Sequence, residues 1–223
     1  MADEDFNIKE ILRNSVVKQK INTLKDYYDE SLFTLALSLS AAVKKMFFEK
    51  SERKFSAEPL LEKKLIIHFL DRMRIDGLEK FNNPAVFSVI HLYASSKDLE
   101  KRINPLGVLI VYVEKTYLPE LLRHLKYPYV EYDDDDEVKD GCGAICNLIA
   151  GSWKREISNL GYIDLEISYF ESYINTNING IEFPKDQTHK YEISFDIDEK
   201  KRIVLEMVMG MVPRREITDD EEN

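Results

Sequence analysis

Asn147 is the residue whose surroundings most strongly suggest chemistry, because it stands among small residues on one side of a predicted helix over 138–160. When the sequence is projected at 100° per residue, the opposite side of this helix is apolar and carries Cys142, Ile145, Cys146, Ile149, Trp153 and Leu160, with Glu156 among them. The side of Asn147 is small and polar and carries Asp140, Gly143, Ala144, Asn147, Gly151, Lys154 and Ser158. A side-chain amide offers two donors and an acceptor oxygen without a charge, so Asn147 can orient a water molecule or a polar group.

The glycines on this small polar side need an explanation, since each costs about 1 kcal/mol relative to alanine inside a helix. One explanation is close packing of the helix against a neighbouring helix or loop. The other is a partner surface that approaches the helix backbone around Asn147. The composition of the helix leaves both explanations open.

Other residue types that could do chemistry lack the spacing that the chemistry needs. The four histidines lie far apart, at His68, His91, His124 and His189, and no spacing typical of a zinc site occurs. Cys142 and Cys146 fall on the apolar side of the helix, which favours reduced thiols that pack in the core. The acidic run over 133–136 lacks the alternating spacing of a calcium loop and fits a solvated helix cap, with Asp134 and Glu137 as a capping arrangement. We therefore expect no metal site.

The helices that position this segment follow from the spacing of apolar residues. A long helix is predicted over 22–48, where apolar residues recur at three- and four-residue steps without glycine or proline. A second helical stretch is predicted over 59–75, where Leu61, Leu65, Phe69 and Met73 repeat at steps of four. A short helix over 120–125 follows Pro119.

The strands are predicted from β-branched residues and from a period of two. Two such segments, at 86–93 and 107–113, are joined by a polar loop. After Gly161 the apolar residues alternate, which predicts strands within 163–169, 191–197 and 203–209. This order predicts an α+β domain in which the two long helices lie on one face of an antiparallel sheet.

Composition limits the classes of partner. The chain has 223 residues and a formal net charge of −10, and its basic residues are scattered, which argues against nucleic acid. No apolar run approaches the roughly 18 residues of a spanning helix, and the segment 1–5 is acidic where a signal peptide is basic. We therefore expect a soluble, cytoplasmic protein.

The string DGCGAICNLIAGSWK, residues 140–154, resembles the signature helix of the CheC/CheX chemotaxis phosphatases. The pattern of that family is Glu-x-x-Asn followed by a Met/Ile-Ala-Gly step, and the order of elements over 84–213 is similar as well. The resemblance implies a CheX-like α+β domain over 84–213. Before it, the N-terminal segment 1–83 would hold the first long helix and an extra helical insertion near 50–80, and 214–223 would form a disordered tail.

Members of this family dock on a phosphorylated CheY-type receiver domain and hasten hydrolysis of its aspartyl phosphate. By this resemblance Asn147 is the catalytic residue that orients the attacking water, and the partner-binding residues are Asp140, Gly143, Ala144, Gly151 and Lys154. The glutamate of the family falls on Ala144, whose methyl group neither forms an ion pair nor accepts a hydrogen bond. Asp140 would lie about 10 Å from Asn147 along the helix axis, against about 4.5 Å for the family position, so it does not substitute. No cofactor is implied, because any Mg²⁺ would belong to the partner.

Three functions are compatible with these residues. The first is a phosphatase of a receiver's acyl phosphate, and the second is a receiver-binding domain in which this activity is weak or lost. The third is a scaffold or dimerisation module that keeps the fold without binding a receiver. Ala144 favours the second. A homodimer is also expected, from the pairing of relatives and from the outward side of strand 203–209, where Val204 and Val208 flank Glu206.

Overall fold

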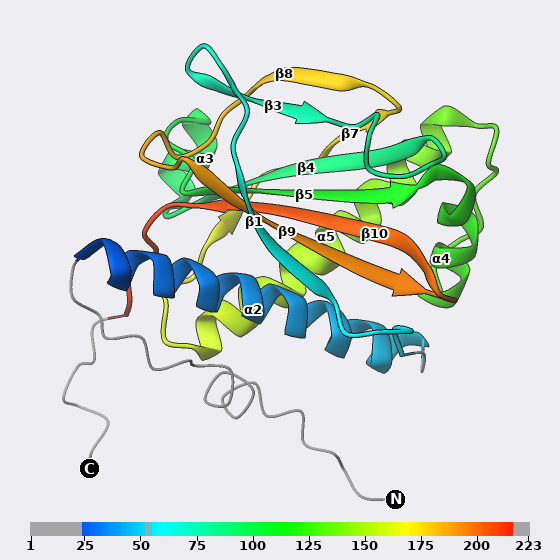
Figure 1. Cartoon of the computed structure of the whole chain (residues 1–223), viewed down its shortest axis with the longest axis horizontal. Coiled ribbons are helices and arrows are strands. Elements are labelled where there is room, and N and C mark those ends of the chain that lie inside the picture. The colour runs from blue at the N-terminus through cyan, green and yellow to red at the C-terminus, as the bar shows by residue number, and fades with distance from the viewer. Residues whose placement is uncertain (1–23, 52–53, 216–223) are drawn as a thin grey trace, which may run out of the picture.

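The structure is a computed structural model that describes residues 24–51 and 54–215 (Figure 1). Its elements, in chain order, are α2 (Leu24–Ser51), β1 (Leu60–Leu65), β2 (His68–Phe69), β3 (Arg72–Asp76), β4 (Ala85–Tyr93), α3 (Ser96–Lys101), β5 (Gly107–Glu114), the 3-10 helix η1 (Lys115–Tyr117), α4 (Leu118–His124), α5 (Asp135–Asn159), β6 (Glu166–Ile167), β7 (Glu171–Ile174), β8 (Asn177–Ile181), β9 (His189–Ile197) and β10 (Lys200–Met209). The predicted tail beyond Arg215 and the predictions for 1–23 lie outside the described residues.

The strands form two antiparallel sheets. The large sheet has seven strands in the order β1-β9-β10-β5-β4-β6, and β7 pairs with β4 as well. The small sheet has three strands in the order β2-β3-β8. The C-terminal strand β10 lies between β9 and β5 in the middle of the large sheet, whereas β1, from the N-terminal part of the described chain, lies at its edge.

The long helices α2 and α5 pack against each other on one face of the large sheet (Figure 1), which confirms the predicted α+β architecture. The face of α2 that meets α5 and the sheet is apolar and consists of Leu32, Leu35, Ala36, Leu39, Val43, Met46 and Phe47, all buried. These residues recur at three- and four-residue steps, so they share one side of the helix. The helical period of the sequence thus located this layer correctly.

Residues 30–51 of α2 are long and apolar enough to cross a membrane by length and composition. The prediction that no apolar run approaches this length is therefore wrong. In the structure the apolar side of the helix is buried against α5 and β9, as in the core helix of a soluble domain.

The small sheet covers the opposite face of the large sheet and forms a second core. The strand side predicted to point outward, with Val204 and Val208, is fully buried in this core against residues of β3 and β8 such as Ile75 and Ile181. The apolar surface that the sequence offered as a basis for dimerisation is thus covered within the chain. That argument for a homodimer is wrong.

Buried charges join the two layers beside this core. Glu206 is fully buried and accepts hydrogen bonds from Lys80, from Lys190 at 2.6 Å and from the hydroxyl of Tyr112 at 3.0 Å. Glu192 accepts from Lys80 and from Lys64, each at 2.6 Å. Since Lys80 contacts both carboxylates, the loop after β3 is tied to β9 and β10.

The predicted helix over 59–75 is wrong, and so is the helical insertion near 50–80. This segment forms β1, β2 and β3 instead. Leu61 packs against the helical layer and Met73 against the second core, whereas Leu65 and Phe69 are exposed, so the four-residue spacing does not mark one buried face. Pairing with β9 and β8 decides the backbone conformation here, which is a tertiary effect that local spacing does not report.

Most other elements are confirmed. Strands β4, β5, β9 and β10 and helices α4 and α5 occur where predicted, within a few residues at their ends. The loop between β4 and β5 contains the short helix α3, and the expected strand over 163–169 is reduced to β6. Strands β7 and β8 were not predicted.

Candidate functional site

Helix α5 carries the candidate site and begins at a well-defined cap. The side chain of Asp134 accepts hydrogen bonds from the N–H groups of Asp136 and Glu137, at 3.0 and 3.1 Å. The Glu137 carboxylate reaches back to the N–H of Glu131 at 2.8 Å. The acidic run therefore provides acceptors for the free N–H groups of the first helical turn, and its negative charges interact favourably with the positive end of the helix dipole, as the sequence suggested.

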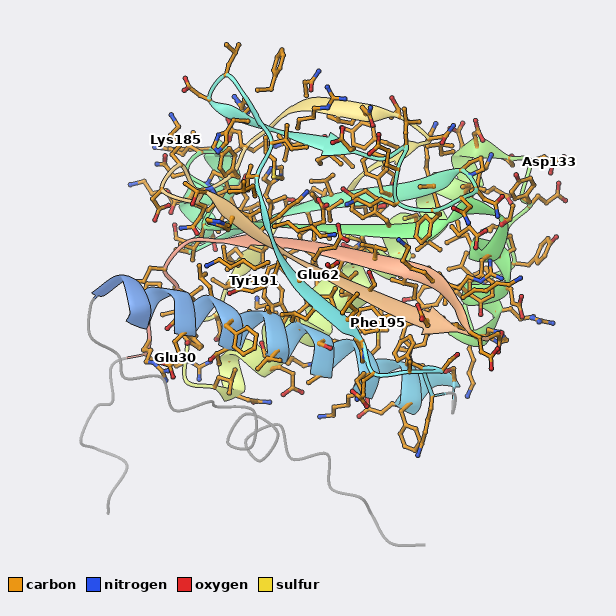
Figure 2. The ribbon with its side chains drawn as sticks, in the orientation of Figure 1. Glu30, Glu62, Asp133, Lys185, Tyr191 and Phe195 are labelled. Atoms are coloured by element: carbon orange, nitrogen blue, oxygen red, sulfur yellow. The ribbon has the colours of Figure 1, made fainter. Side chains whose placement is uncertain are left out.

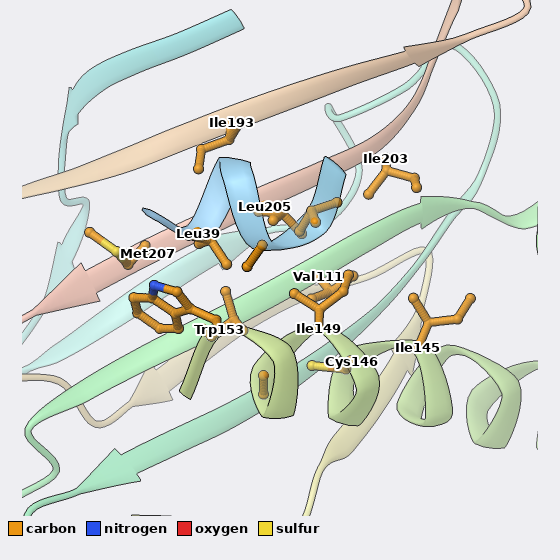
Figure 3. Close-up of a cluster of buried hydrophobic side chains, with 14 of the residues drawn as sticks. Leu39, Val111, Ile145, Cys146, Ile149, Trp153, Ile193, Ile203, Leu205 and Met207 are labelled. Atoms are coloured by element: carbon orange, nitrogen blue, oxygen red, sulfur yellow. The ribbon is translucent and has the colours of Figure 1, made fainter. Parts of the chain in front are cut away.

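The apolar side of α5 anchors the helix rigidly between α2 and the sheet. Ile145, Ile149 and Trp153 are fully buried among core residues (Figure 3). The indole N–H of Trp153 donates to the carbonyl of Leu35 at 3.2 Å and to the hydroxyl of Ser38 at 3.0 Å. These contacts confirm the predicted orientation of α5 and hold it against α2.

The two thiols belong to this buried side. Cys142 and Cys146 are free and fully buried, and their sulfur atoms lie 3.8 and 3.7 Å from the carbonyl oxygens of Val111 and Ser88. Burial raises the pKa of the Cys142 thiol to about 12, so the protonated form persists at neutral pH. Neither thiol is placed to act as a nucleophile.

The opposite side of α5 is open to solvent around Asn147. Asn147 and Asp140 are exposed, while Ala144, Gly151 and Lys154 are half-buried. A β-carbon on Gly151 would meet no atom of residues 24–51 and 54–215 within 4 Å. The packing of this chain therefore does not require glycine at position 151, which removes the close-packing explanation there.

Gly143 has a different environment. A β-carbon on Gly143 would lie 2.2 to 2.4 Å from ring atoms of Phe170, which precedes β7. Glycine is needed at this position because the Phe170 ring packs directly on the helix backbone. The structure thus places Asp140, Ala144, Asn147, Gly151 and Lys154 on one open face of α5, which we call the α5 face, and Gly143 beneath Phe170 at its margin.

Comparisons with solved structures identify the fold. The fold is similar to that of a CheC-like superfamily protein from Shewanella sp. PV-4, with a TM-score of 0.51, 16% identity, and coverage of 79% of this chain and 97% of that chain. It is similar to the chemotaxis protein CheX from Vibrio vulnificus, with a TM-score of 0.52, 12% identity, and coverage of 78% and 97%. The CheX protein of Desulfovibrio desulfuricans gives 0.50, 13%, 78% and 98%. The chain has the CheC/CheX fold. No family model matches the sequence, and no curated protein is significantly similar to it.

Strand β7, which follows Phe170, directs no acidic side chain to the side of the large sheet that faces the helices. The hydroxyls of Ser172 on β7 and Ser88 on β4 are 2.7 Å apart on the side that faces the helices. Tyr173 stacks on Phe87, which belongs to the second core on the other side. Glu171 bonds to the Tyr173 hydroxyl at 2.9 Å and alternates with Ser172, so it lies on the side away from Asn147.

The chemistry available to the α5 face is therefore positioning by an amide. Asn147 can hold a water molecule, but the α5 face has no carboxylate one helical turn before it to pair with a cation of a partner. Within residues 24–51 and 54–215, no group of three or more His, Cys, Asp or Glu side chains could hold a metal ion.

Sequence reasoning missed Phe170 at the margin of the α5 face, whose ring explains the glycine at position 143. Phe170 follows the exposed Tyr169 in a loop held by Ser168, whose hydroxyl accepts from the N–H of His91 at 2.9 Å. Tyr169 is the last residue of the predicted strand over 163–169, and Phe170 lies just beyond it. The contact of Phe170 with α5 depends on the position of the chain before β7, which pairs with β4.

Proposed function

We propose that this chain binds a phosphorylated CheY-type receiver domain through the α5 face, with weak or lost aspartyl-phosphate phosphatase activity. The observation that carries the proposal is the exposure of Asn147 beside the open position at Gly151, on the long helix of a CheC/CheX fold. Glycine costs about 1 kcal/mol in a helix interior, and no contact in the described part of the chain compensates for that cost at position 151. A partner whose backbone approaches the helix closely would use the open space at Gly151.

The residual chemistry would be orientation of the attacking water by Asn147. An acyl phosphate is cleaved by in-line attack of water, and catalysis of phosphoryl transfer depends mainly on positioning and electrostatic stabilisation. The methyl group of Ala144 supplies no charge to pair with a lysine of the receiver. Loss of one positioned catalytic group commonly costs roughly 10²- to 10⁴-fold in rate, so we expect slow turnover at best.

The chain needs no cofactor for this role, since the receiver would carry its own Mg²⁺. Receiver domains of two-component systems act in the cytoplasm, so the proposal also places this protein there, in chemotaxis or related signalling.

A second candidate is a scaffold or dimerisation module that keeps the fold without binding a receiver, because one fold can serve several functions. The two candidates differ in one measurable property, because only the first requires the α5 face to be free for a partner.

Binding to purified receiver domains, with and without beryllofluoride as a phosphate mimic, tests the proposal. We expect binding that depends on beryllofluoride and is abolished by Gly151→Trp. The matched control is Glu49→Trp, at an exposed position on α2. Helix α2 lies on the buried side of α5, to which the Lys45–Glu156 ion pair also joins it. Binding that survives Gly151→Trp would show that another surface is used, and absence of binding to every receiver tested would favour the scaffold.

A further inference from the structure

A pocket opens at the end of the large sheet where β5 ends and β10 begins. Its volume is about 500 Å³, and it lies between the loop over 77–84 and the first residues of β10. Phe195, which Figure 2 labels on β9, pairs with Ile203 close to this pocket. Glu114 lines the pocket and alternates with Val113 of the helical core, so the pocket is on the side of the sheet away from α5. Its volume is typical of a small-molecule site.

The walls of this pocket are held in place by contacts within the chain. The carboxylate of Glu114 is buried and accepts hydrogen bonds from Asn83 and Arg202. The N–H of Lys115 donates to the carbonyl of Pro84 at 2.8 Å, which fixes the end of the loop against β5. The pocket is therefore formed before a ligand binds, and little ordering is left to oppose binding.

The pocket concentrates positive charge on a chain whose net charge is −10. Among the described residues that line it, four side chains are cationic and two are anionic. Lys80 and Arg202 already pair with buried carboxylates. Lys200 and Lys201 are exposed and form no ion pair with any described residue. Because adjacent cations repel each other, an anion in the pocket would stabilise both.

A β-bulge brings the cations of β10 to the same pocket. Lys201 and Ile203 pair with consecutive residues of β9, so Arg202 is an extra residue in β10. Side chains of a regular strand point alternately to opposite faces, yet Lys200, Lys201 and Arg202 all line this pocket. Bulges redirect side chains in this way beside functional sites.

The loop over 77–84 supplies groups of a different kind. Glu79 is exposed and forms no ion pair within the described ranges, and the side-chain amide of Asn82 makes no hydrogen bond there. A carboxylate accepts hydrogen bonds from hydroxyl groups, as it does from ribose in dinucleotide sites. Phe81 joins the two walls, because its ring centre lies 5.9 Å from the ammonium group of Lys201.

We propose that this pocket binds a sugar phosphate, either free or as part of a mononucleotide. The phosphate would lie against Lys200 and Lys201 on β10, where a dianion balances the two free lysines. The sugar hydroxyls would lie against Glu79 and Asn82 of the loop. Inorganic phosphate offers no such hydroxyls and would be repelled by Glu79. The pocket is separate from the α5 face, so the proposal does not rest on receiver binding.

Isothermal titration calorimetry of the full chain with ribose 5-phosphate, AMP, adenosine and inorganic phosphate tests the proposal. We expect both sugar phosphates to bind with a Kd below about 1 mM. Inorganic phosphate should bind at least about fivefold more weakly, and adenosine should not bind. Tighter binding of AMP would identify a nucleotide as the ligand, whereas an affinity for ribose 5-phosphate that is at least equal would identify the free sugar phosphate.

Variants of the two walls test the assigned contacts separately. Lys200→Gln combined with Lys201→Gln should weaken both sugar phosphates at least about tenfold, because the cations that bind phosphate are lost. The matched control is Lys97→Gln combined with Lys101→Gln, on exposed positions of α3 at the opposite end of the sheet, and should leave binding unchanged. Glu79→Ala should weaken ribose 5-phosphate about fivefold but strengthen inorganic phosphate, because it removes a hydroxyl acceptor and a repelling charge together.

Three results would overturn the proposal. The first is that neither sugar phosphate binds at about 10 mM, and the second is that inorganic phosphate or adenosine binds as tightly as the sugar phosphates. The third is that the lysine variants bind unchanged, or that Glu79→Ala shifts the affinities for ribose 5-phosphate and inorganic phosphate in the same direction. All the altered residues are exposed, so each variant should keep the melting temperature of the wild type without ligand.

Discussion

At the scale of single residues, the proposed function makes position 144 the test of how much catalysis the α5 face could support. An acid there would lie three residues before Asn147, on the same face of the helix, and could pair with a lysine of a bound receiver. We predict that Ala144→Glu accelerates decay of a phosphorylated receiver at least about tenfold, which is about 1.4 kcal/mol of barrier. The measurement is the decay of the radiolabelled acyl phosphate with and without the protein.

Two matched variants make this prediction specific. Ala144→Gln has the same length without the charge and should give a smaller gain, and Asn147→Ala in the Ala144→Glu background should remove the gain while binding persists. An unchanged decay rate in Ala144→Glu, with binding intact, would mean that the mechanism is wrong.

The pKa of Glu192 predicts an acid-sensitive contribution to stability. Its side chain is desolvated by burial, but hydrogen bonds and charges from Lys64 and Lys80 outweigh this effect and lower its pKa to about 2. A carboxyl group whose pKa is lower in the folded state stabilises the fold above its unfolded pKa, near 4.5, and this contribution is lost as the pH falls toward 2. The loss is of order 3 kcal/mol.

Urea unfolding of the wild type and of Glu192→Gln between pH 7 and pH 2 measures this contribution. The variant should be less stable at pH 7 and should lose less free energy of unfolding between pH 4.5 and pH 2. Glu49→Gln, at an exposed position, provides the control. Parallel curves for the wild type and Glu192→Gln would contradict the assignment.

At the scale of elements, the two glycines of α5 should respond to alanine in opposite directions. Gly151→Ala adds a methyl group in open space and improves helix propensity, so it should stabilise the protein by about 0.5 to 1 kcal/mol. Gly143→Ala drives its β-carbon into the Phe170 ring and should destabilise by about 1 to 3 kcal/mol. Chemical denaturation of both variants checks the pair. The combination of Gly143→Ala with Phe170→Leu should cost less than the sum of the two single changes, since Leu leaves room for the methyl group.

Trp153 anchors α5 to α2, and its removal measures the strength of that contact. Trp153→Ala deletes a fully buried ring and leaves a cavity, so it should cost about 3 to 5 kcal/mol of unfolding free energy. Trp153→Phe keeps most of the volume but leaves the carbonyl of Leu35 and the hydroxyl of Ser38 without the indole donor, and it should cost less. A loss below about 1 kcal/mol for Trp153→Ala would mean that this contact is not a major part of the core.

The elements that the sequence predicts well are those whose period is set by one buried face. The apolar side of α5 belongs to this class, whereas β4 and β5 are buried on both faces and are predicted from their β-branched and aromatic residues. The segment over 60–76 does not, because β1 and β3 serve different sheets and their buried residues belong to different cores. For the candidate site, the sequence located the helix and Asn147, but only the coordinates separate the open Gly151 from Gly143 beneath Phe170.

At the scale of the whole molecule, the large sheet is buried on both faces, so the side chains on the face away from the helices are not open to solvent. Val204 and Val208 on β10 look like solvent-facing apolar residues of a half-exposed strand, yet the small sheet covers them. The α5 face, by contrast, is open to solvent around Asn147.

The central place of β10 also has a consequence for synthesis on the ribosome. Helix α2 and strand β1 are made early, but β9, against which both pack, and β10, which completes the core above them, emerge roughly 150 residues later. At about 5 to 20 residues per second, the part of the apolar side of α2 that packs against the sheet stays uncovered for about 7 to 30 s. The nascent chain is therefore expected to engage chaperones during this interval, and stalling translation before β10 should leave α2 open to proteolysis, whereas stalling after β10 has cleared the ribosome should protect it.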